Sequence, residues 1–299
     1  MFFAEYGKAF DEDIPYKEVP YESSPYVLRK NWETAFGLQE TDGLKPSDYI
    51  VALSEEHING NLTYEELEKN VKAYYIHSTQ DDRGEEADLS SIRINRILAS
   101  TGFRLSPVTL MNYHKQIFEG VRGYVYPVGK FRDVNISKEQ QVLGGLSVNY
   151  IDFREIKDTL IWDFEQENSY PYKNKSKDEI AHHVMKFISN VWQIHPFREG
   201  NTRTIAVFTI KYLRHYDFEI DNEPFKEHSK YFRNALVIDN APFKYKTNEY
   251  LQKFTENTVL SGNNVLDLND MVRRFHLINQ TENKQISQLQ SQKDNNSSL

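Results

Sequence analysis

The segment that most constrains the fold is a helical stretch that is apolar on nearly every side. Residues 201–215 contain apolar side chains all around the helix axis, namely Ile205, Ala206, Val207, Phe208, Ile210 and Leu213. A helix without a broad polar face is stable in water only when other elements surround it. The preceding residues, 177–194, have a single apolar face made by Ile180, Val184, Phe187, Val191 and Ile194. The sequence therefore predicts a helical bundle built around residues 201–215.

Most of the remaining chain also has helical spacing of its apolar residues. Capping boxes at Thr63 with Glu66 and at Ser176 with Glu179 mark the starts of two helices. Residues 1–30 show no sustained period and are expected to form an irregular arm, and the polar residues 288–299 are expected to fray. Helices are predicted near residues 31–40, from 46, 63–77, 86–101, 107–120, 153–167, 177–194, 201–215, 223–238, 246–261 and 266–280.

One stretch, between Tyr124 and Tyr150, breaks the helical pattern. Gly144 and Gly145 lie between two short apolar runs, and both central positions of a type I′ turn require positive φ. The sequence therefore predicts a β-hairpin, so the expected fold class is all-α with one β-hairpin flap.

Charge and composition exclude several classes of function. The formal net charge of -8 disfavours nucleic acids and anionic membranes as partners. The absence of cysteine excludes disulfides, thiolate metal sites and cysteine nucleophiles, and it fits a cytoplasmic protein. The first residues lack the pattern of a signal peptide, and no stretch approaches the ~20 apolar residues of a membrane span.

Residues 195–203, His-Pro-Phe-Arg-Glu-Gly-Asn-Thr-Arg, form a polar loop that leads into the apolar helix. Free N–H groups and the positive dipole end at a helix start favour an anion, and Gly200 lets the backbone approach it closely. Arg203 adds positive charge, and Glu199 could hold Mg²⁺ beside bound phosphates. His195 could take a proton from an attacking hydroxyl. The loop is thus predicted to be a phosphate site with a general base.

This loop resembles the signature of the Fic family, His-x-Phe-x-(Asp/Glu)-Gly-Asn-Gly-Arg-x-x-Arg. Residues 126–137, YPVGKFRDVNIS, also resemble Fic sequence, and the likeness covers roughly residues 86–262. The resemblance implies a Fic-type helical bundle and a protein adenylyltransferase. Such an enzyme uses ATP and Mg²⁺ to transfer AMP to a Ser, Thr or Tyr hydroxyl of a target protein. The matching residues are His195, Phe197, Glu199, Gly200, Asn201 and Arg203.

The resemblance also implies a role for each matching position. His195 would be the catalytic base, Phe197 would anchor the loop, and Glu199 would bind the metal. Nucleotide binding would fall to Gly200, Asn201, Thr202 and Arg203. The flap would align the target segment by strand pairing, which assigns target docking to Val142, Leu143, Gly144, Gly145, Leu146, Ser147 and Val148.

Two signature positions depart from the family pattern. Thr202 replaces the second glycine, and Ala206 replaces the final arginine, which in the family contacts the terminal phosphate and an inhibitory glutamate. The loss of a guanidinium should weaken or redirect nucleotide binding. Transfer of another nucleotide or phosphate-linked group, and a catalytically inactive Fic-fold binding module, therefore remain as alternatives.

Residues 35–71 resemble the small antitoxin partners of Fic toxins, which suggests a toxin–antitoxin origin. Leu38 and Asp42 stand where the inhibitory motif has Ser/Thr and Glu, so Asp42 is a degenerate candidate for the inhibitory residue. Because Ala206 offers no guanidinium, no salt bridge to Asp42 is expected, and the segment is predicted to stabilise the core rather than block ATP.

The domain prediction that follows is an N-terminal extension with antitoxin-like helices over residues 1–80. A Fic core would span residues 81–262, and a C-terminal helix with a tail would span 263–299. The expected partner is a target protein, and the sequence leaves open both auto-modification and a homodimer.

Overall fold

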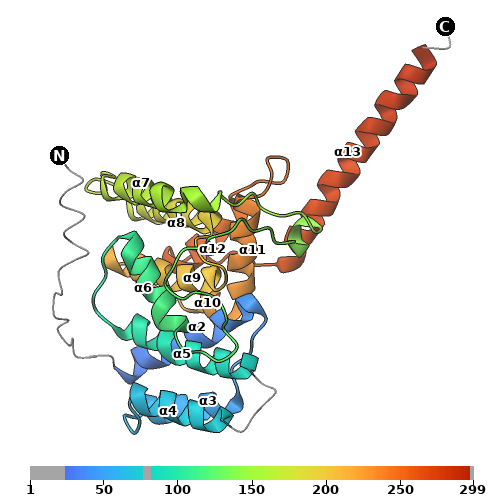
Figure 1. Ribbon diagram of the computed structural model, residues 1–299. Helices are drawn as coiled ribbons and strands as arrows, with labels where there is room; N and C mark the ends of the chain where they lie inside the picture. Colours follow the sequence, from blue (N-terminus) through green and yellow to red (C-terminus); the bar gives the residue numbers. More distant parts are fainter. Residues whose placement is uncertain (1–23, 77–81, 297–299) are drawn as a thin grey trace.

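The computed structural model describes residues 24–76 and 82–296, which form helices joined by turns and loops (Figure 1). The first five helices and one 3₁₀ turn are α2 (Pro25–Gln39), η1 (Glu40–Asp42), α3 (Asp48–Ile58), α4 (Tyr64–Tyr75), α5 (Asp82–Ala99) and α6 (Pro107–Phe118). The remaining elements are η2 (Gln141–Leu143), η3 (Phe153–Glu155), α7 (Ile156–Asn168), α8 (Lys177–Ile194), α9 (Asn201–His215), α10 (Glu223–Glu227), α11 (Ser229–Asp239), α12 (Glu249–Val259) and α13 (Leu268–Asn296).

The predicted central helix is confirmed as α9. Every residue from Asn201 to Leu213 is buried, and the helix lies in the middle of the bundle, with α8 and α6 packed against it (Figure 1). Phe208 contacts the rings of Phe103 and Phe164, which belong to different parts of the bundle. Both predicted capping boxes are present, at the starts of α4 and α8. Burial of α9 on all sides fixes the position of the loop that precedes it.

The N-terminal helices α2, α3 and α4 share a second, smaller apolar core with α5. Trp32, Leu67 and Val71 pack there against Leu89 and Ile92 of α5. The next turns of α5, with Ile94, Ile97 and Leu98, belong to the main core instead. α5 therefore couples the N-terminal helices to the bundle, while the domain boundaries near residues 80 and 262 stay a prediction.

The predicted β-hairpin is wrong, because residues 24–76 and 82–296 contain no strand. Both glycines do adopt positive φ, 59° for Gly144 and 95° for Gly145, and Gln140 N–H donates to the Leu146 carbonyl. However, Gln141–Leu143 form a 3₁₀ turn, and Val142 and Leu143 are buried in the main core. The turn chemistry was therefore predicted correctly, but burial of the two apolar side chains replaces strand pairing.

The C-terminal prediction also needs correction, since α13 continues to Asn296 and projects away from the bundle (Figure 1). Its first turns are anchored, because Met271 is buried and Phe275 packs against the main core. The following Gln- and Lys-rich sequence has good helix propensity, which lets the anchored helix continue beyond the bundle.

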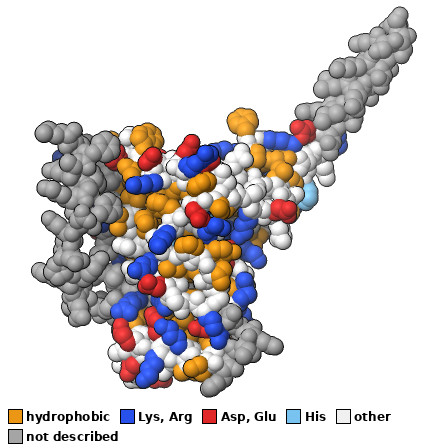
Figure 2. All heavy atoms as spheres, in the orientation of Figure 1, with side chains coloured by type: hydrophobic (Ala, Val, Ile, Leu, Met, Phe, Trp, Pro, Cys, Tyr) orange, Lys and Arg blue, Asp and Glu red, His pale blue; other side chains and the backbone are white. Residues whose placement is uncertain are grey.

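Of the predicted N-terminal arm, residues 1–23 lie outside the described residues. Residues 25–30 belong to α2, which starts at Pro25 with Ser24 as its cap. None of the helices in the described ranges combines the length and the apolar character that a bilayer crossing requires. Figure 2 shows basic and acidic side chains scattered over one face of the bundle, with hydrophobic side chains between them.

Candidate active site

The loop between α8 and α9 is shaped by two residues with left-handed backbone conformation. His195 caps the end of α8 with φ of 51°, and Gly200 starts α9 with φ of 74°. A Cβ atom at Gly200 would lie 2.4 Å from a ring carbon of Phe118. Glycine at this position is therefore required both by the backbone and by the close approach of the ring.

Hydrogen bonds within the loop hold its polar residues in place. The Asn201 side chain accepts a hydrogen bond from Phe197 N–H at 3.0 Å and donates one to the Phe197 carbonyl at 2.9 Å. The Phe197 ring is fully buried and stacks on the His114 ring with a centroid distance of 3.9 Å. Phe197 thus anchors the loop in the core, as the resemblance implied.

His114 of α6 holds the loop between α8 and α9 by a hydrogen bond to its backbone. Its Nδ1 accepts a hydrogen bond from Gly129 N–H at 2.8 Å, so Nε2 carries the proton and donates to the Glu199 carbonyl at 3.1 Å. The Tyr124 hydroxyl donates to the same carbonyl at 3.1 Å. Burial lowers the pKa of His114 to about 4, which keeps the ring neutral and this pattern intact at pH 7.

Arg132 also holds the loop between α8 and α9 by hydrogen bonds to backbone carbonyls. Its side chain is almost completely buried and donates to the carbonyls of His195 at 2.9 Å and of Val134 at 2.7 Å. It also donates to the Ile151 carbonyl at 2.5 Å, and its backbone N–H donates to the Pro196 carbonyl at 2.7 Å. Arg132 therefore joins the segment before the flap to the motif loop, and backbone carbonyls accept the hydrogen bonds of its guanidinium.

His195 has the protonation state that a general base needs. Its Nδ1 lies 3.3 Å from the Trp192 carbonyl, which can only accept, so Nδ1 carries the proton and Nε2 has a free lone pair. Burial lowers the pKa of the His195 imidazole to about 3, and nearby basic side chains act in the same direction. The Tyr150 ring packs against the imidazole at a centroid distance of 4.4 Å. The ring is thus neutral and fixed in orientation near pH 7.

The first turn of α9 and Glu199 provide the groups for a metal-bound phosphate. The first N–H groups of a helix have no partner inside the helix. Glu199 is half-buried and borders both cavities of the site. Among the described residues, no three His, Asp or Glu side chains are grouped to hold a metal. A single carboxylate nevertheless fits Mg²⁺ that arrives with phosphate and water oxygens as its other ligands.

Two cavities meet at Asp42, Lys138 and Glu199. The cavity beside His195 has a volume of only about 10 Å³, which is room for about one water. The second cavity, of about 340 Å³, reaches Tyr124, Tyr126 and Arg203 and is large enough for a small ligand. In this conformation the space next to the base is small, and Asp42 belongs to the walls of both cavities.

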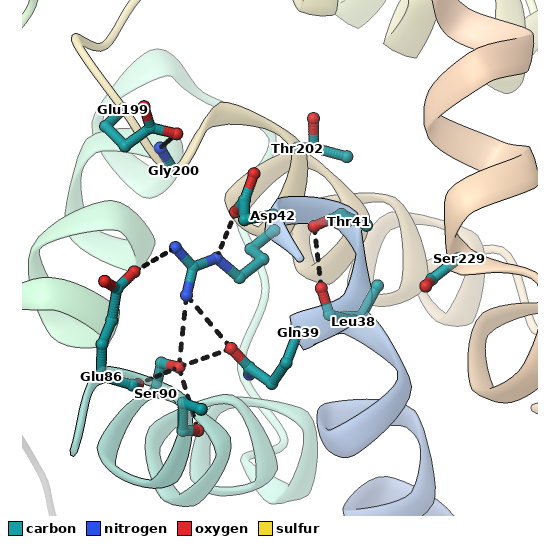
Figure 3. Close-up of polar contacts among 12 residues, drawn as sticks. Leu38, Gln39, Thr41, Asp42, Glu86, Ser90, Glu199, Gly200, Thr202 and Ser229 are labelled. Carbon is teal, nitrogen blue, oxygen red and sulfur yellow. Dashed lines mark hydrogen bonds and ion pairs between the residues drawn. The ribbon is translucent and has the colours of Figure 1, made fainter. Parts of the chain in front are cut away.

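Side chains from α2, η1, α5 and α6 surround the Arg203 guanidinium, and Figure 3 shows three of them, Gln39, Asp42 and Glu86. The guanidinium lies 2.7 Å from the Asp42 carboxylate and 2.5 Å from the Glu86 carboxylate. It also donates to Gln39 Oε1 at 3.1 Å and lies over the Phe118 ring at 4.7 Å from the centroid. Burial disfavours its charged form, but Asp42 and Glu86 hold the pKa of Arg203 above its ordinary value.

This cluster overturns the expectation that Asp42 has no guanidinium partner. The salt bridge forms with Arg203, one turn before the position where the signature lacks its final arginine. Ala206 does not face either cavity, because it is completely buried in the main core. Leu38, at the other degenerate position, is completely buried in the same core. The Thr202 hydroxyl accepts a hydrogen bond from the Trp192 indole at 3.2 Å.

The structure thus brings together His195, Glu199, Gly200, Asn201, Thr202 and Arg203, together with Asp42. The flap residues 142–148 themselves line neither cavity. In the sequence they lie between Lys138 and Tyr150, which both line the cavity beside His195. Sequence reasoning missed Glu86, His114, Arg132, Lys138 and Arg233. Only the stretch at 126–137 carried a signal for one of these, since it contains Arg132.

The chain is similar to known proteins over part of its length. Residues 104–213 match the model of the Fic/DOC family. A curated relative, the probable protein adenylyltransferase y4lH of Sinorhizobium fredii (strain NBRC 101917 / NGR234), is 35% identical over 65 residues. These are 22% of this chain and 33% of the relative, so the chain spans about a third of that protein's length.

Two solved structures are similar at low identity. The N-terminal FIC domain of the Bep8 protein from Bartonella sp. 1-1C is 17% identical, with a TM-score of 0.48, over 62% of this chain and 88% of that chain. A Fic family protein from Desulfovibrio desulfuricans G20 is 12% identical, with a TM-score of 0.48, over 91% and 78%. The Fic/DOC family match includes the loop from His195 to Arg203, and the chain therefore contains a Fic/DOC family domain over residues 104–213.

Proposed function

We propose that the chain is a protein adenylyltransferase that transfers AMP from Mg-ATP to a Ser, Thr or Tyr hydroxyl of a target protein. The observation that carries this proposal is the neutral His195 imidazole, whose Nε2 has a free lone pair beside the start of α9. The name of the curated relative and the family match support a transferase of this kind.

In the proposed reaction the target hydroxyl oxygen attacks the α-phosphorus of ATP. A new P–O bond forms, the bond from the α-phosphorus to the bridging oxygen breaks, and pyrophosphate leaves. His195 Nε2 takes the hydroxyl proton, while the N–H groups at the start of α9 bind phosphate oxygens. Mg²⁺ held by Glu199 and the phosphates would neutralise negative charge on the leaving group. Arg132 and Asn201 keep the loop in the required shape.

We also propose that the described conformation is a resting state in which Asp42 inhibits the enzyme. Arg203, expected to bind phosphate, is paired with Asp42 and Glu86 instead. The cavity beside His195 is too small for a phosphate group while Asp42 forms part of its wall. ATP would bind once η1 moves and the phosphates of the nucleotide replace the Asp42 carboxylate as the partner of Arg203.

Target docking at the flap stays part of the proposal. Gly144, Gly145 and Leu146 are exposed, while the flanking Val142, Leu143 and Val148 are buried. The buried residues would hold the flap, and the exposed ones would contact the target.

The test is labelling of proteins in a lysate by the purified chain with ATP that carries the label at the α or the γ position. Adenylylation predicts labelled protein from α-labelled ATP alone and loss of the signal in His195→Ala. His182→Ala is a matched control, because His182 is half-buried in α8 but belongs to neither cavity of the site. Labelled protein from γ-labelled ATP, or equal labelling by His195→Ala, would contradict the proposal.

Two observations favour the alternatives that the sequence left open. The Thr202 hydroxyl is used by Trp192, and Ala206 is buried, so the phosphate site differs from the family pattern. Transfer of another nucleotide or phosphate-linked group predicts labelling from GTP, CTP or UTP but not from ATP. A catalytically inactive binding module predicts no labelling from any of the four nucleotides.

A further inference from the structure

The positive charges around His195 fall into two kinds. Arg132 is saturated by backbone carbonyls, and Arg203 is neutralised by two carboxylates. Lys138 and Arg233 are different, since neither forms an ion pair with any carboxylate in residues 24–76 and 82–296. Lys138 and Arg233 therefore share the walls of the cavity beside His195 with the carboxylates of Asp42 and Glu199, but neither is held in an ion pair with them.

Both side chains border the cavity beside the base. Lys138 is an exposed residue at the start of the flap, and its backbone N–H donates to Ser147 Oγ at 3.2 Å. It lines both cavities, whereas Arg233, which is half-buried on α11, lines only the one beside His195. The two charges thus approach the same space from separate elements, the flap and α11.

Arg233, which lines the cavity beside His195, is held in place by neutral hydrogen-bond partners. Its guanidinium donates to Gln140 Oε1 at 2.8 Å, and Gln140 is almost completely buried. The Gln140 amide in turn donates to the Tyr150 hydroxyl at 3.2 Å, and the Tyr150 ring packs on His195. An amide oxygen orients a guanidinium without cancelling its charge, so the remaining N–H groups of Arg233 can take an anion.

We propose that Lys138 and Arg233 bind phosphate oxygens of the nucleotide and so supply the positive charge that the signature lacks at Ala206. This inference rests on the proposed function and adds residues that set the preference for a polyphosphate. The cavity that both side chains line also includes Asn201 and Thr202 at the start of α9, so a phosphate bound there would be near both the helix start and the two basic side chains. Such an arrangement stabilises the charge that develops on departing pyrophosphate.

In the described conformation, the anionic group near Lys138 that a nucleotide could displace is the Asp42 carboxylate. Asp42 and Glu199 are the two carboxylates that lie with Lys138 in the walls of both cavities, and Asp42 is the one that comes from the N-terminal segment. An incoming polyphosphate would displace the single negative charge of Asp42 and bring several negative charges of its own. With the Asp42 carboxylate displaced, Lys138 and Arg233 would favour ligands with more phosphates.

The experiment measures binding of inorganic pyrophosphate and of ATP, ADP and AMP by calorimetry, with the full chain in an Asp42→Asn background. We compare Lys138→Gln and Arg233→Gln with Lys130→Gln, an exposed lysine of the preceding loop that lines neither cavity. Each charge removal should weaken pyrophosphate and ATP about tenfold or more, as expected for a charged hydrogen bond, and AMP much less. Arg233→Lys should recover part of the affinity.

Equal pyrophosphate and ATP affinity in the parent, Lys138→Gln and Arg233→Gln would overturn the inference, as would a parent that binds neither ligand. Circular dichroism checks that Arg233→Gln is folded, and Lys138→Gln gives an independent result from an exposed position. Labelling from α-labelled ATP tests the proposed function separately. Pyrophosphate binding that depends on both residues, without any protein labelling, would support the inference while contradicting adenylylation.

Discussion

Replacement of Asp42 by asparagine should activate the enzyme by freeing Arg203. The substitution keeps the shape of the side chain and removes its charge. The pair is shielded from water, since the Arg203 and Asp42 side chains are 1% and 15% exposed, and its atoms lie 2.7 Å apart. The two groups form an ion pair without hydrogen-bond alignment, and such a partly buried pair contributes about 1.5–3 kcal/mol, between the values of exposed and fully buried pairs. At about 1.4 kcal/mol per factor of ten, the apparent affinity for ATP should rise roughly 10- to 140-fold.

The fold should survive this change, because Glu86 still pairs with Arg203 at 2.5 Å and no buried charge is left alone. The assay combines calorimetry with ATP and protein labelling from α-labelled ATP, both at subsaturating nucleotide. Glu40→Gln is the matched control, since Glu40 is an exposed carboxylate of the same 3₁₀ turn η1. This substitution changes the net charge of the protein by the same amount as Asp42→Asn.

The reasoning would be refuted by an Asp42→Asn protein that is folded but binds and transfers no better than the parent. It would also be refuted if Glu40→Gln gave the same gain, because the effect would then come from net charge and not from Arg203. A rise confined to Asp42→Asn is the expected outcome.

Three further predictions concern the support of the site. Gly200→Ala should lower the free energy of unfolding by about 2 kcal/mol, because its Cβ would meet the Phe118 ring; Gly60→Ala, with φ of 79° and open space, should cost only about 1 kcal/mol in the same urea titration. His114 has a folded pKa of about 4, below the ordinary 6.5, so the unfolded chain binds its proton first as pH falls; stability from this group is complete above pH 6.5 and is lost towards pH 4. Between pH 7 and pH 5, urea unfolding should show a loss of stability about 2 kcal/mol smaller in His114→Gln than in the parent, because His195, whose pKa is also lowered by burial, contributes in both proteins; equal losses would contradict this. Ala206→Arg should destabilise the protein without tightening ATP binding, because residue 206 lies in the core; a folded variant with higher ATP affinity would contradict its burial.

The sequence alone determined the helices and the composition of the loop. α8 and α9 begin and end at the predicted residues because their signals are local, a capping box at Ser176 and a change from apolar to polar residues at His195. The same holds for positive φ at Gly144 and Gly145. Such signals act over a few residues, so they can be read from the chain without knowledge of its packing.

Tertiary structure alone decided whether the flap pairs as strands and which groups surround the base. Val142 and Leu143 have the composition of a strand, yet they are buried in the main core beside α11 and α13. The partners of Arg203 come from far away in the sequence, since Glu86 is 117 residues distant and Gln39 is 164 residues distant. Arg233 likewise reaches the flap across 93 residues. A charged side chain is paired by whatever the folded bundle brings within a few ångströms, and no local spacing encodes that choice.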